Sequence, residues 1–269
     1  MSGKEAWEFA SRSVAQRRRF QQIMTMLFEK GFATVDELME SLDVSRMTVH
    51  RDLDELQARG SLMKVRGGAT VARTGNFESS WRYRREDNLE LKQAIARKAV
   101  EYVDPGDSII IDPSSTAYVL SQLLHEKTPL KVVTCSLPVI NELSEVPEIE
   151  LHVIGGVYDP NFNSFMGANA EEAAANFRVD KIFMSTAAVA GRTICHSQAR
   201  AISLDRQFFN AAREHILIFD STKLSHTALH VFGDAAEWQK IITDSRADPA
   251  ALDELRQAGP EVIVVDVDS

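Results

Sequence analysis

The sequence predicts an N-terminal helical domain, built as a winged helix-turn-helix, followed by a C-terminal α/β domain with a mostly parallel sheet. Three observations lead to this fold class. With 269 residues, the chain is long enough for one small and one larger domain. Residues 1–85 hold 15 Lys and Arg against 11 Asp and Glu, a net charge of +4, whereas the rest holds 15 against 28, a net charge of −13. Beyond Asp107, strand-like and helix-like segments alternate.

The composition excludes several classes of protein. Hydrophobic residues make up 44% and charged residues 26% of the chain, as in soluble globular proteins, so disorder is not indicated. No stretch approaches the roughly 18 apolar residues that a membrane span needs, and we expect a cytoplasmic protein. Cys135 and Cys195 have no Cys or His at metal-ligand spacing. We therefore expect two buried thiols, and neither a metal nor another cofactor.

Three helices are predicted in the first domain, which spans 16–72. Apolar residues recur at helical spacing over 20–28. A short second helix follows Thr34, carries acidic residues in its first turn and ends near Asp43. Ser45 is a good N-cap for a third helix that closes at residues 59–60. The tight turn between the last two helices makes a helix-turn-helix.

A small hairpin is predicted directly after these helices. Residues 62–66 alternate toward Gly67-Gly68, and 69–71 complete the pattern, as in the wing of a winged helix. Such a bundle could also be an inert adaptor. Basic residues at its exposed positions favour double-stranded DNA as the partner instead, because they suit phosphate.

Position within this motif predicts which residues contact DNA. In such folds the N-terminal turns of the third helix enter the major groove, so arginine there can bind guanine and hydroxyls can reach phosphate or a base edge. Basic residues of the wing and of the first helix can anchor on the DNA backbone. The acidic residues Asp52, Asp54 and Glu55 are expected to face away from DNA or to pair with basic neighbours, and His50 has a plain surface histidine as its alternative. The candidate DNA-binding residues are Arg17, Arg18, Arg19, Ser45, Arg46, Thr48, His50, Arg51, Lys64 and Arg66.

The second domain, 91–269, follows a linker at 73–90 that lacks an apolar period. Alternating strands and helices imply a sheet covered by helices, with a ligand site at the carboxyl ends of the strands. The expected helices are 91–103, 116–124, 138–143, 202–212 and 250–258. The expected strands are 108–112, 131–134, 150–154, 181–184, 215–219, 240–243 and 262–265.

Polar residues gather directly after these strands. Their hydroxyls and backbone amides, together with one lysine, suit an anion, so we expect a small phosphorylated molecule. For any single loop the alternative is that Ser and Thr simply cap the following helix. The candidate effector-binding residues are Asp112, Ser114, Ser115, Thr116, Thr134, Ser136, Gly155, Gly156, Ser185, Thr186, Asp220 and Lys223.

These residues resemble the DeoR family of repressors. Residues 45–56 and 65–69 look like that family's recognition helix and wing. The resemblance implies a C-terminal sensor similar to phosphosugar isomerases and coenzyme A transferases, which binds a sugar phosphate that alters DNA affinity. It continues through 92–99, 112–116, 134–137, 154–156, 164–167 and 220–223.

The chain departs from the family's pattern at three places in the expected sensor. Residues 185–189 replace a Gly-rich stretch, and Pro113-Ser114 replaces a Ser-Gly pair. Ser203 and Asp205 stand where the family has an acidic residue and a lysine. These differences leave the identity of the effector open.

Two functions are compatible with these features. The first is a sequence-specific DNA-binding regulator, a repressor of a sugar-use operon, that acts as a homodimer or tetramer and binds a phosphorylated sugar. The second is an enzyme that isomerises or deaminates a phosphosugar and carries a DNA-binding head, with Asp112, His196 and Asp220 as candidate acids or bases. The two carboxylates could equally cap loops, and His196 is expected at the surface. We therefore assign no catalytic residue and favour the regulator.

Overall fold

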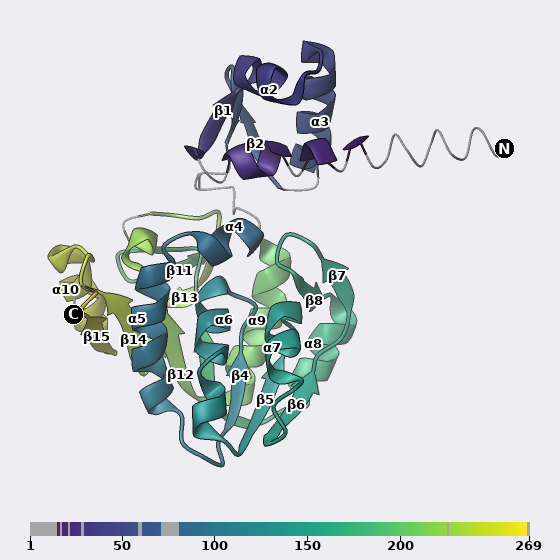
Figure 1. Cartoon of the computed structure of the whole chain (residues 1–269). Helices are drawn as coiled ribbons and strands as arrows, with labels where there is room; N and C mark the ends of the chain where they lie inside the picture. The colour runs from purple at the N-terminus through teal and green to yellow at the C-terminus, as the bar shows by residue number, and fades with distance from the viewer. Residues whose placement is uncertain are drawn as a thin grey trace, which may run out of the picture. The chain divides into compact units, whose positions relative to one another are not determined.

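The computed structural model describes residues 15–16, 18–20, 22–27, 30–58, 61–70, 81–224 and 226–267. The chain divides into two compact units, Met1–Tyr83 and Arg84–Ser269 (Figure 1). The predicted fold class is confirmed, since a helix-turn-helix with a wing precedes an α/β unit with a parallel sheet. Arg17 and positions 73–80 of the expected linker lie outside the described residues.

The N-terminal unit combines helices with a three-stranded sheet of order β1-β3-β2. Residues 15–16, 18–20, 22–27 and 30 are helical. The predicted second helix, third helix and hairpin are all confirmed, while the first strand is an addition to the prediction. The elements are β1 (Phe32–Thr34), α2 (Val35–Leu42), α3 (Arg46–Ala58), β2 (Met63–Val65) and β3 (Gly68–Thr70).

Capping interactions explain where α2 begins and ends. Thr34 Oγ1 accepts a hydrogen bond from Glu37 N at 3.1 Å, and Glu37 Oε2 accepts one from Thr34 N at 2.8 Å, which completes a capping box. Asp43 has a φ of 49°, in the left-handed region where chains commonly leave a helix. Beneath the helices, the core of the unit consists of Phe20, Ile23, Leu27, Ala33, Val35, Leu38, Val49, Leu53, Leu56, Leu62 and Ala69.

Two glycines make the turn of the wing possible. Gly67 has a φ of +85°, which residues with a side chain rarely adopt. A Cβ atom on Gly68 would lie 2.2 Å from the carbonyl oxygen of Ala33, in the paired strand β1. The turn therefore requires glycine at position 67, and the pairing of β3 with β1 requires glycine at position 68.

The second unit is built on a seven-stranded sheet in which every pair of neighbours is parallel. Its strand order is β15-β14-β12-β9-β4-β5-β6. All the predicted strands are confirmed. They are β4 (Ser108–Ile111), β5 (Leu130–Thr134), β6 (Ile149–Val153), β9 (Val179–Met184), β12 (Ala212–Ile218), β14 (Lys240–Asp244) and β15 (Glu261–Val265).

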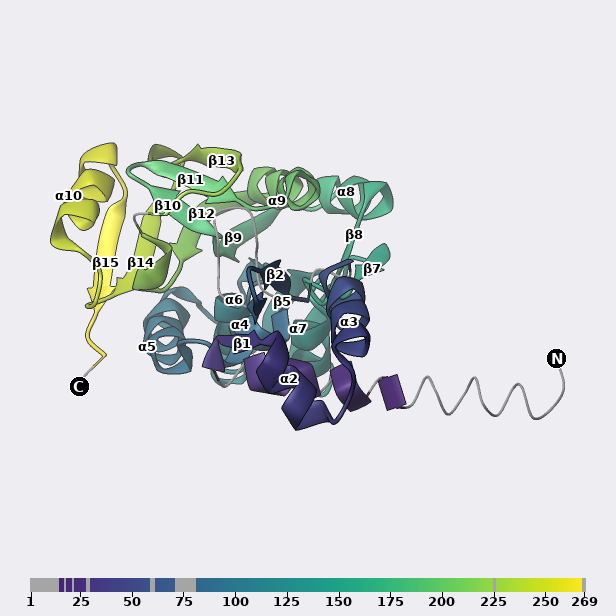
Figure 2. The same ribbon diagram turned by 90° about the horizontal axis from the view of Figure 1, so that it is seen from above.

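Helices cover both faces of this sheet, as Figures 1 and 2 show. Successive strand residues point to opposite faces. Accordingly, Ile109 and Ile111 pack in the core beneath α5, α6 and α7, while Ile110 packs in the core beneath α8, α9 and α10. The six helices are α5 (Leu89–Ala99), α6 (Ser115–Ser121), α7 (Leu137–Leu143), α8 (Ala168–Ala175), α9 (Ala199–Ala211) and α10 (Pro249–Ala258).

Several short elements were not predicted. Helix α4 (Trp81–Glu86) lies within the linker expected at 73–90. Helix α5 begins at Leu89, before the expected end of that linker. A helix of six residues such as α4 holds too few apolar positions for a helical period to show in the sequence. Short 3-10 turns also occur, at Val100–Tyr102, Leu124–Lys127, Ser221–Lys223 and Ala235–Glu237.

Two small antiparallel sheets were missed as well. β7 pairs with β8, and β11 lies between β10 and β13. Three of these strands, β7, β8 and β10, have three residues each, too few for an alternating pattern to show. Their bounds are β7 (Val157–Asp159), β8 (Ser164–Met166), β10 (Ala188–Ala190), β11 (Thr193–His196) and β13 (His230–Asp234).

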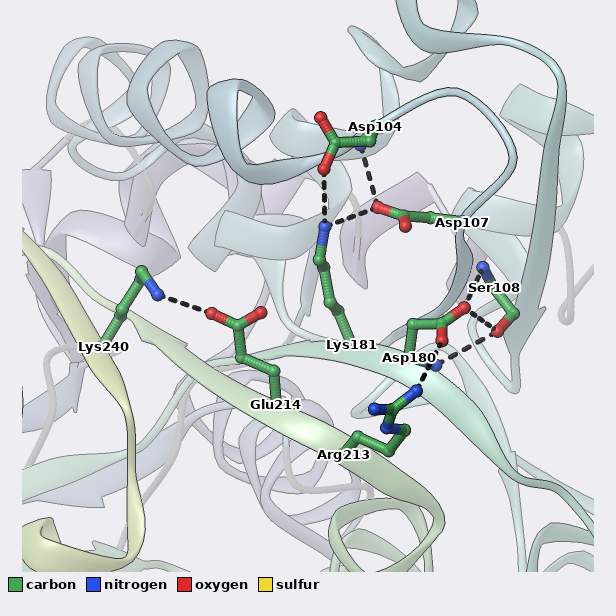
Figure 3. A network of polar contacts seen from close by, with 8 residues as sticks. All are labelled: Asp104, Asp107, Ser108, Asp180, Lys181, Arg213, Glu214 and Lys240. Atoms are coloured by element: carbon green, nitrogen blue, oxygen red, sulfur yellow. Dashed lines mark hydrogen bonds and ion pairs between the residues drawn. The ribbon is translucent and has the colours of Figure 1, made fainter.

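A network of charged and polar side chains joins the amino ends of the central strands (Figure 3). Lys181 Nζ lies 3.1 Å from Asp104 Oδ2 and 2.7 Å from Asp107 Oδ2. Asp180 Oδ2 accepts hydrogen bonds from Ser108 N at 3.0 Å and Ser108 Oγ at 2.6 Å. These contacts connect β4 to β9, so this edge of the sheet has a structural role.

We expect Ser108→Ala to lower the free energy of unfolding by about 0.5–1 kcal/mol at pH 7, the usual net value of a part-exposed hydrogen bond. The bonds from Ser108 lower the pKa of Asp180. A carboxyl whose pKa is lowered on folding stabilises the fold above its unfolded pKa, and that stabilisation is lost as the pH falls through the folded pKa. The difference between wild type and variant should therefore shrink below about pH 4.

Urea unfolding at pH 7 and at pH 3 measures this difference. Ser144→Ala, at an exposed helix end, is the matched control and should behave as wild type at both pH values. A Ser108→Ala penalty of the same size at both pH values would contradict the role given to Asp180.

Candidate functional site

Helix α3 presents two different faces. An α-helix has 3.6 residues per turn, so the stripe opposite its buried side holds positions 47, 51, 54 and 58. All four are exposed, and His50 beside them is exposed too. The buried side consists of Val49, Asp52, Leu53 and Leu56.

Three of the candidate DNA-binding residues at the start of α3 are engaged within the unit. Ser45 Oγ lies 3.0 Å from Thr48 Oγ1 and accepts a hydrogen bond from Thr48 N at 3.3 Å, so the pair caps the helix. Arg46 Nη2 forms an ion pair with Asp36 Oδ1 of α2. Both partners of that pair are exposed, so the interaction contributes little to stability.

His50 and Arg51 differ from these three. Neither has a hydrogen bond or an ion pair with any residue that the structure describes. Their side chains are exposed on the turns that follow the helix-turn-helix turn, where a recognition helix meets base edges. These two residues are the candidates that the geometry favours most for base recognition.

The contacts of Arg19 do not fit the phosphate-binding role expected for it. Arg19 Nε donates to Asp52 Oδ2 at 2.6 Å, and Arg19 Nη2 donates to Asp52 Oδ1 at 3.2 Å. These bonds raise the pKa of Arg19, and the Asp52 side chain is fully buried. Arg19 therefore neutralises a buried carboxylate of α3, whereas Arg18 beside it is exposed.

The wing attaches to α3 through one of its candidate residues. Lys64 Nζ forms an ion pair with Asp54 Oδ1, and Lys64 N donates to Gln57 Oε1 at 2.8 Å. Arg66 is exposed at the wing turn. The pairing expected for Asp52 and Asp54 is thus confirmed.

In the second unit, β4 and β9 lie side by side at a switch point of the sheet. The chain proceeds from β4 through β5 to β6 on one side, and from β9 through β12 and β14 to β15 on the other. Open parallel sheets bind their ligands beyond the carboxyl ends of the strands at such a point. We call this place, where β4, β5, β9 and β12 end, the carboxyl-end edge.

Asp112 connects two loops at the carboxyl-end edge. Its Oδ1 accepts hydrogen bonds from Ser114 N at 3.1 Å and Ser114 Oγ at 2.5 Å, and its Oδ2 accepts one from Ser185 N at 2.8 Å. Burial raises the pKa of Asp112, although these bonds act in the opposite direction. Asp112 therefore positions the residues after β4 and β9.

Two of the predicted hydroxyls are occupied by backbone partners. Thr134 Oγ1 donates to Ile111 O at 2.8 Å, and Thr186 Oγ1 donates to Cys195 O at 2.7 Å. These threonines hold loops in place through carbonyl groups, and neither of them caps a helix as the alternative suggested. Ser115 and Thr116 lie buried in the first turn of α6.

Ser136 and Ser164 bring two further hydroxyls to the carboxyl-end edge. The residues pair in an antiparallel bridge, and both are fully buried. Neither Oγ atom has a hydrogen-bond partner among the described residues. Buried hydroxyls normally have hydrogen-bond partners, so these two can accept a polar ligand as a partner. Ser164 was not predicted as a site residue, because nothing in the sequence shows that β8 approaches β5.

Two buried cations lie in the elements around this edge. Lys223, in the turn after β12, is 5% exposed. Arg84, in α4, is 4% exposed, lies 5.4 Å from the Phe162 ring centroid and lowers the pKa of Asp112. Arg84 was not among the predicted site residues because its position falls within the expected linker.

The remaining candidates are less directly placed. Gly155 and Gly156 are exposed after β6. A Cβ atom on Gly156 would lie 2.6 Å from Met166 O, so this glycine is required by close packing of the chain. Asp220 is buried, and its Oδ1 accepts a hydrogen bond from Thr222 N at 3.2 Å, which caps the turn that holds Lys223.

His196 is not at the surface, contrary to our expectation. Its side chain is 13% exposed because β11 lies between two strands and Phe162 covers the ring at 5.9 Å. Its Nδ1 lies 3.1 Å from Gln198 N, and its Nε2 lies 4.0 Å from Asp205 Oδ2. Ser203 and Asp205 are the two helix residues expected to differ from the family's pattern. Asp205 lies beside His196. Ser203 Oγ donates a hydrogen bond to Glu171 Oε2 at 2.6 Å.

The two cysteines are buried free thiols, as predicted, and burial raises the pKa of Cys135 well above its usual value. In the part of the chain that the structure describes, no three His, Cys, Asp or Glu side chains are grouped to hold a metal ion. Among the same residues, no helix is long and apolar enough to cross a membrane.

Comparison with known protein families gives two matches. Residues 19–74 match the DeoR-like helix-turn-helix domain, and residues 87–245 match the DeoR C terminal sensor domain. Together these two models cover the recognition helix, the wing and the whole carboxyl-end edge.

Individual relatives match over nearly their full length. The lactose phosphotransferase system repressor of Lactococcus lactis subsp. lactis is 31% identical over 90% of this chain and 96% of that protein. Its namesake from Streptococcus mutans is 30% identical over 87% of this chain and 94% of that protein. Among solved structures, ribose 5-phosphate isomerase A from Methanocaldococcus jannaschii is similar, with 19% identity and a TM-score of 0.38 over 51% of this chain and 55% of that one.

Proposed function

Because this chain belongs to the DeoR family of transcriptional regulators, we propose that it represses a sugar-use operon and that a phosphorylated sugar controls it. The relatives named as repressors of a lactose phosphotransferase system support the sugar connection. The observation that carries the proposal is the exposed side of α3. There His50 and Arg51 stand without partners among the described residues, in the unit that matches a DNA-binding family.

The N-terminal unit would bind operator DNA in the manner of a winged helix. α3 would lie in the major groove with Arg51 on the two acceptors of a guanine. Arg18 and Arg66, both exposed, would contact phosphates. Ser45, Arg46, Thr48 and Lys64 would contribute chiefly through the shape of the helix and wing that they hold.

The second unit would bind the effector at the carboxyl-end edge. Lys223 and Arg84 supply positive charge for a phosphate, and the hydroxyls of Ser136 and Ser164 supply hydrogen bonds for it or for sugar hydroxyls. Asp112 orients the loops between which the ligand would lie. We propose binding without turnover, in the cytoplasm where the operator is, since His196 is enclosed by its own neighbours.

A dimer or tetramer of this chain would present two N-terminal units to a pseudo-symmetric operator. The effector would change operator affinity only through a difference in its affinity for the two states of that assembly. Analytical ultracentrifugation of the full chain measures the oligomeric state, and a monomer at micromolar concentration would remove this part of the proposal.

Selection from random-sequence DNA by the full chain tests the proposed function. Enrichment of one pseudo-palindromic sequence, bound at moderate salt and released by one member of a panel of hexose and pentose phosphates, is the expected result. Absence of any enriched sequence would refute the proposal. Release of product from the same panel would instead favour the enzyme.

Lys223→Met is expected to leave operator affinity unchanged and to raise the sugar-phosphate concentration for half-maximal response about tenfold, as for loss of a charge-assisted hydrogen bond. The change removes the charge and keeps most of the unbranched apolar stem of the side chain. Lys131→Met, at the opposite end of the sheet, removes the same charge from an exposed site and should respond as wild type. Equal responses of the two variants would argue against Lys223 as an effector residue.

A further inference from the structure

We propose that Met47 reads the methyl group of a thymine in the operator, about two base pairs from the base that Arg51 contacts. This inference rests on the proposed function and names one base that the DNA site recognises. Met47 is 80% exposed in the first turn of α3 and was not among the predicted DNA-binding residues.

The position of Met47 places it on the reading side of the helix. It lies four residues before Arg51 and three before His50, so the three side chains are neighbours on the surface of α3. None of the three has a hydrogen bond or an ion pair with a described residue. Ser45, Arg46 and Thr48, which surround Met47 in sequence, are engaged in the cap and in the pair with Asp36.

An apolar side chain at this place has few uses within the unit. Exposed apolar groups contribute nothing to the stability of the fold, whereas their burial on binding is favourable. Among the described residues of the N-terminal unit, the other exposed large hydrophobic ones are Phe32 and Val65, which lie on strands and not on α3. Met47 is therefore the apolar contact that α3 offers to a partner.

The major groove presents one apolar group, the C5-methyl of thymine. A methionine is unbranched and adaptable, which suits contact with a single methyl group. The positive charge of Arg51 and the exposed Arg66 of the wing favour DNA over an apolar protein surface as the occupant.

The spacing also predicts where the thymine lies. Four residues of α-helix rise about 6 Å, and base pairs are about 3.4 Å apart, so the two contacts fall about two base pairs from each other. The selected operator half-site should therefore contain a constant thymine about two base pairs from a constant guanine.

Replacement of that thymine by uracil removes only the methyl group and is the sharpest test. Wild-type affinity should fall about fourfold, the factor that corresponds to loss of one buried methylene-sized group. Met47→Ala should bind the thymine operator about fourfold more weakly and should no longer distinguish thymine from uracil. Met47→Leu, which keeps an apolar side chain, should retain most of the distinction.

The outcomes separate this inference from the proposed function. An operator without a constant thymine near the guanine, or an equal uracil penalty in wild type and Met47→Ala, would overturn the inference and leave the repressor standing. A change of oligomeric state in Met47→Ala with unchanged base preference would overturn it too, because Met47 would then belong to a protein interface. If wild type enriches no sequence at all, the proposed function itself fails.

Discussion

Replacing Arg51 with alanine is expected to weaken operator binding by about 1–3 kcal/mol, or about 5- to 150-fold, as for loss of one bidentate contact to guanine. The side chain is exposed and has no partner among the described residues, so its removal should not destabilise the N-terminal unit. Fluorescence anisotropy with the selected operator measures the loss.

A base contact and a phosphate contact of Arg51 make different predictions. Loss of a base contact relaxes the preference for one base pair, while loss of a phosphate contact weakens all sequences equally and lowers the salt dependence by about one ion. We expect relaxed preference at one guanine in each half-site. Arg97→Ala, which removes the same charge from an exposed position of α5, should leave affinity and preference unchanged. A uniform loss over all sequences would reassign Arg51 to the backbone.

The main architecture follows from hydrophobic periodicity. Strands such as β12 and helices such as α9 are long enough for the period to show, since β12 ends in three buried residues and α9 buries one face. By contrast, β1, β7 and β10 have three residues each, too few for an alternating pattern to show. β1 also pairs with β3, which lies far along the chain, and local patterns contain no information about such a partner.

The site residues also differ in whether a local pattern or a distant contact determines them. Positions within the helix-turn-helix and after the strands were predictable, because a local motif fixes where Arg51 and Asp112 lie. What each side chain contacts was not, since Arg19 finds Asp52 across 33 residues and Ser136 finds Ser164 across the sheet edge. Arg84 was missed for a third reason, namely that a six-residue helix resembles a linker.

The pair of Arg19 and Asp52 should be worth more to the N-terminal unit than any exposed pair in it. Asp52→Ala is expected to lower the local stability of α3 by about 2–4 kcal/mol, since removal of one member of a buried pair leaves the other uncompensated. The Arg19 side chain is 18% exposed, which keeps the estimate below that for a fully buried pair. Hydrogen exchange of peptides covering residues 46–58 in the full chain measures the loss.

Helix α3 provides a matched control for this substitution. Asp54→Ala removes the same carboxylate two positions along the helix, where Asp54 is 63% exposed and pairs with Lys64. That change should lower the local stability of α3 by less than about 1 kcal/mol, because an exposed ion pair contributes no more than that. Similar protection in the two variants would show that Asp52 does not anchor the helix.

A double variant distinguishes two roles of Arg19, namely neutralisation of Asp52 and binding of DNA phosphate. Arg19→Met with Asp52→Leu replaces the pair by apolar groups, and such replacement of a buried pair is often neutral. If Arg19 acts only on Asp52, the double variant should recover both the protection of α3 and operator affinity, and its salt dependence should equal that of wild type. If Arg19 also binds phosphate, protection should return, while affinity stays reduced and the slope of log affinity against log salt falls by about 0.9. The bidentate geometry at a fully buried carboxylate leads us to expect the first result.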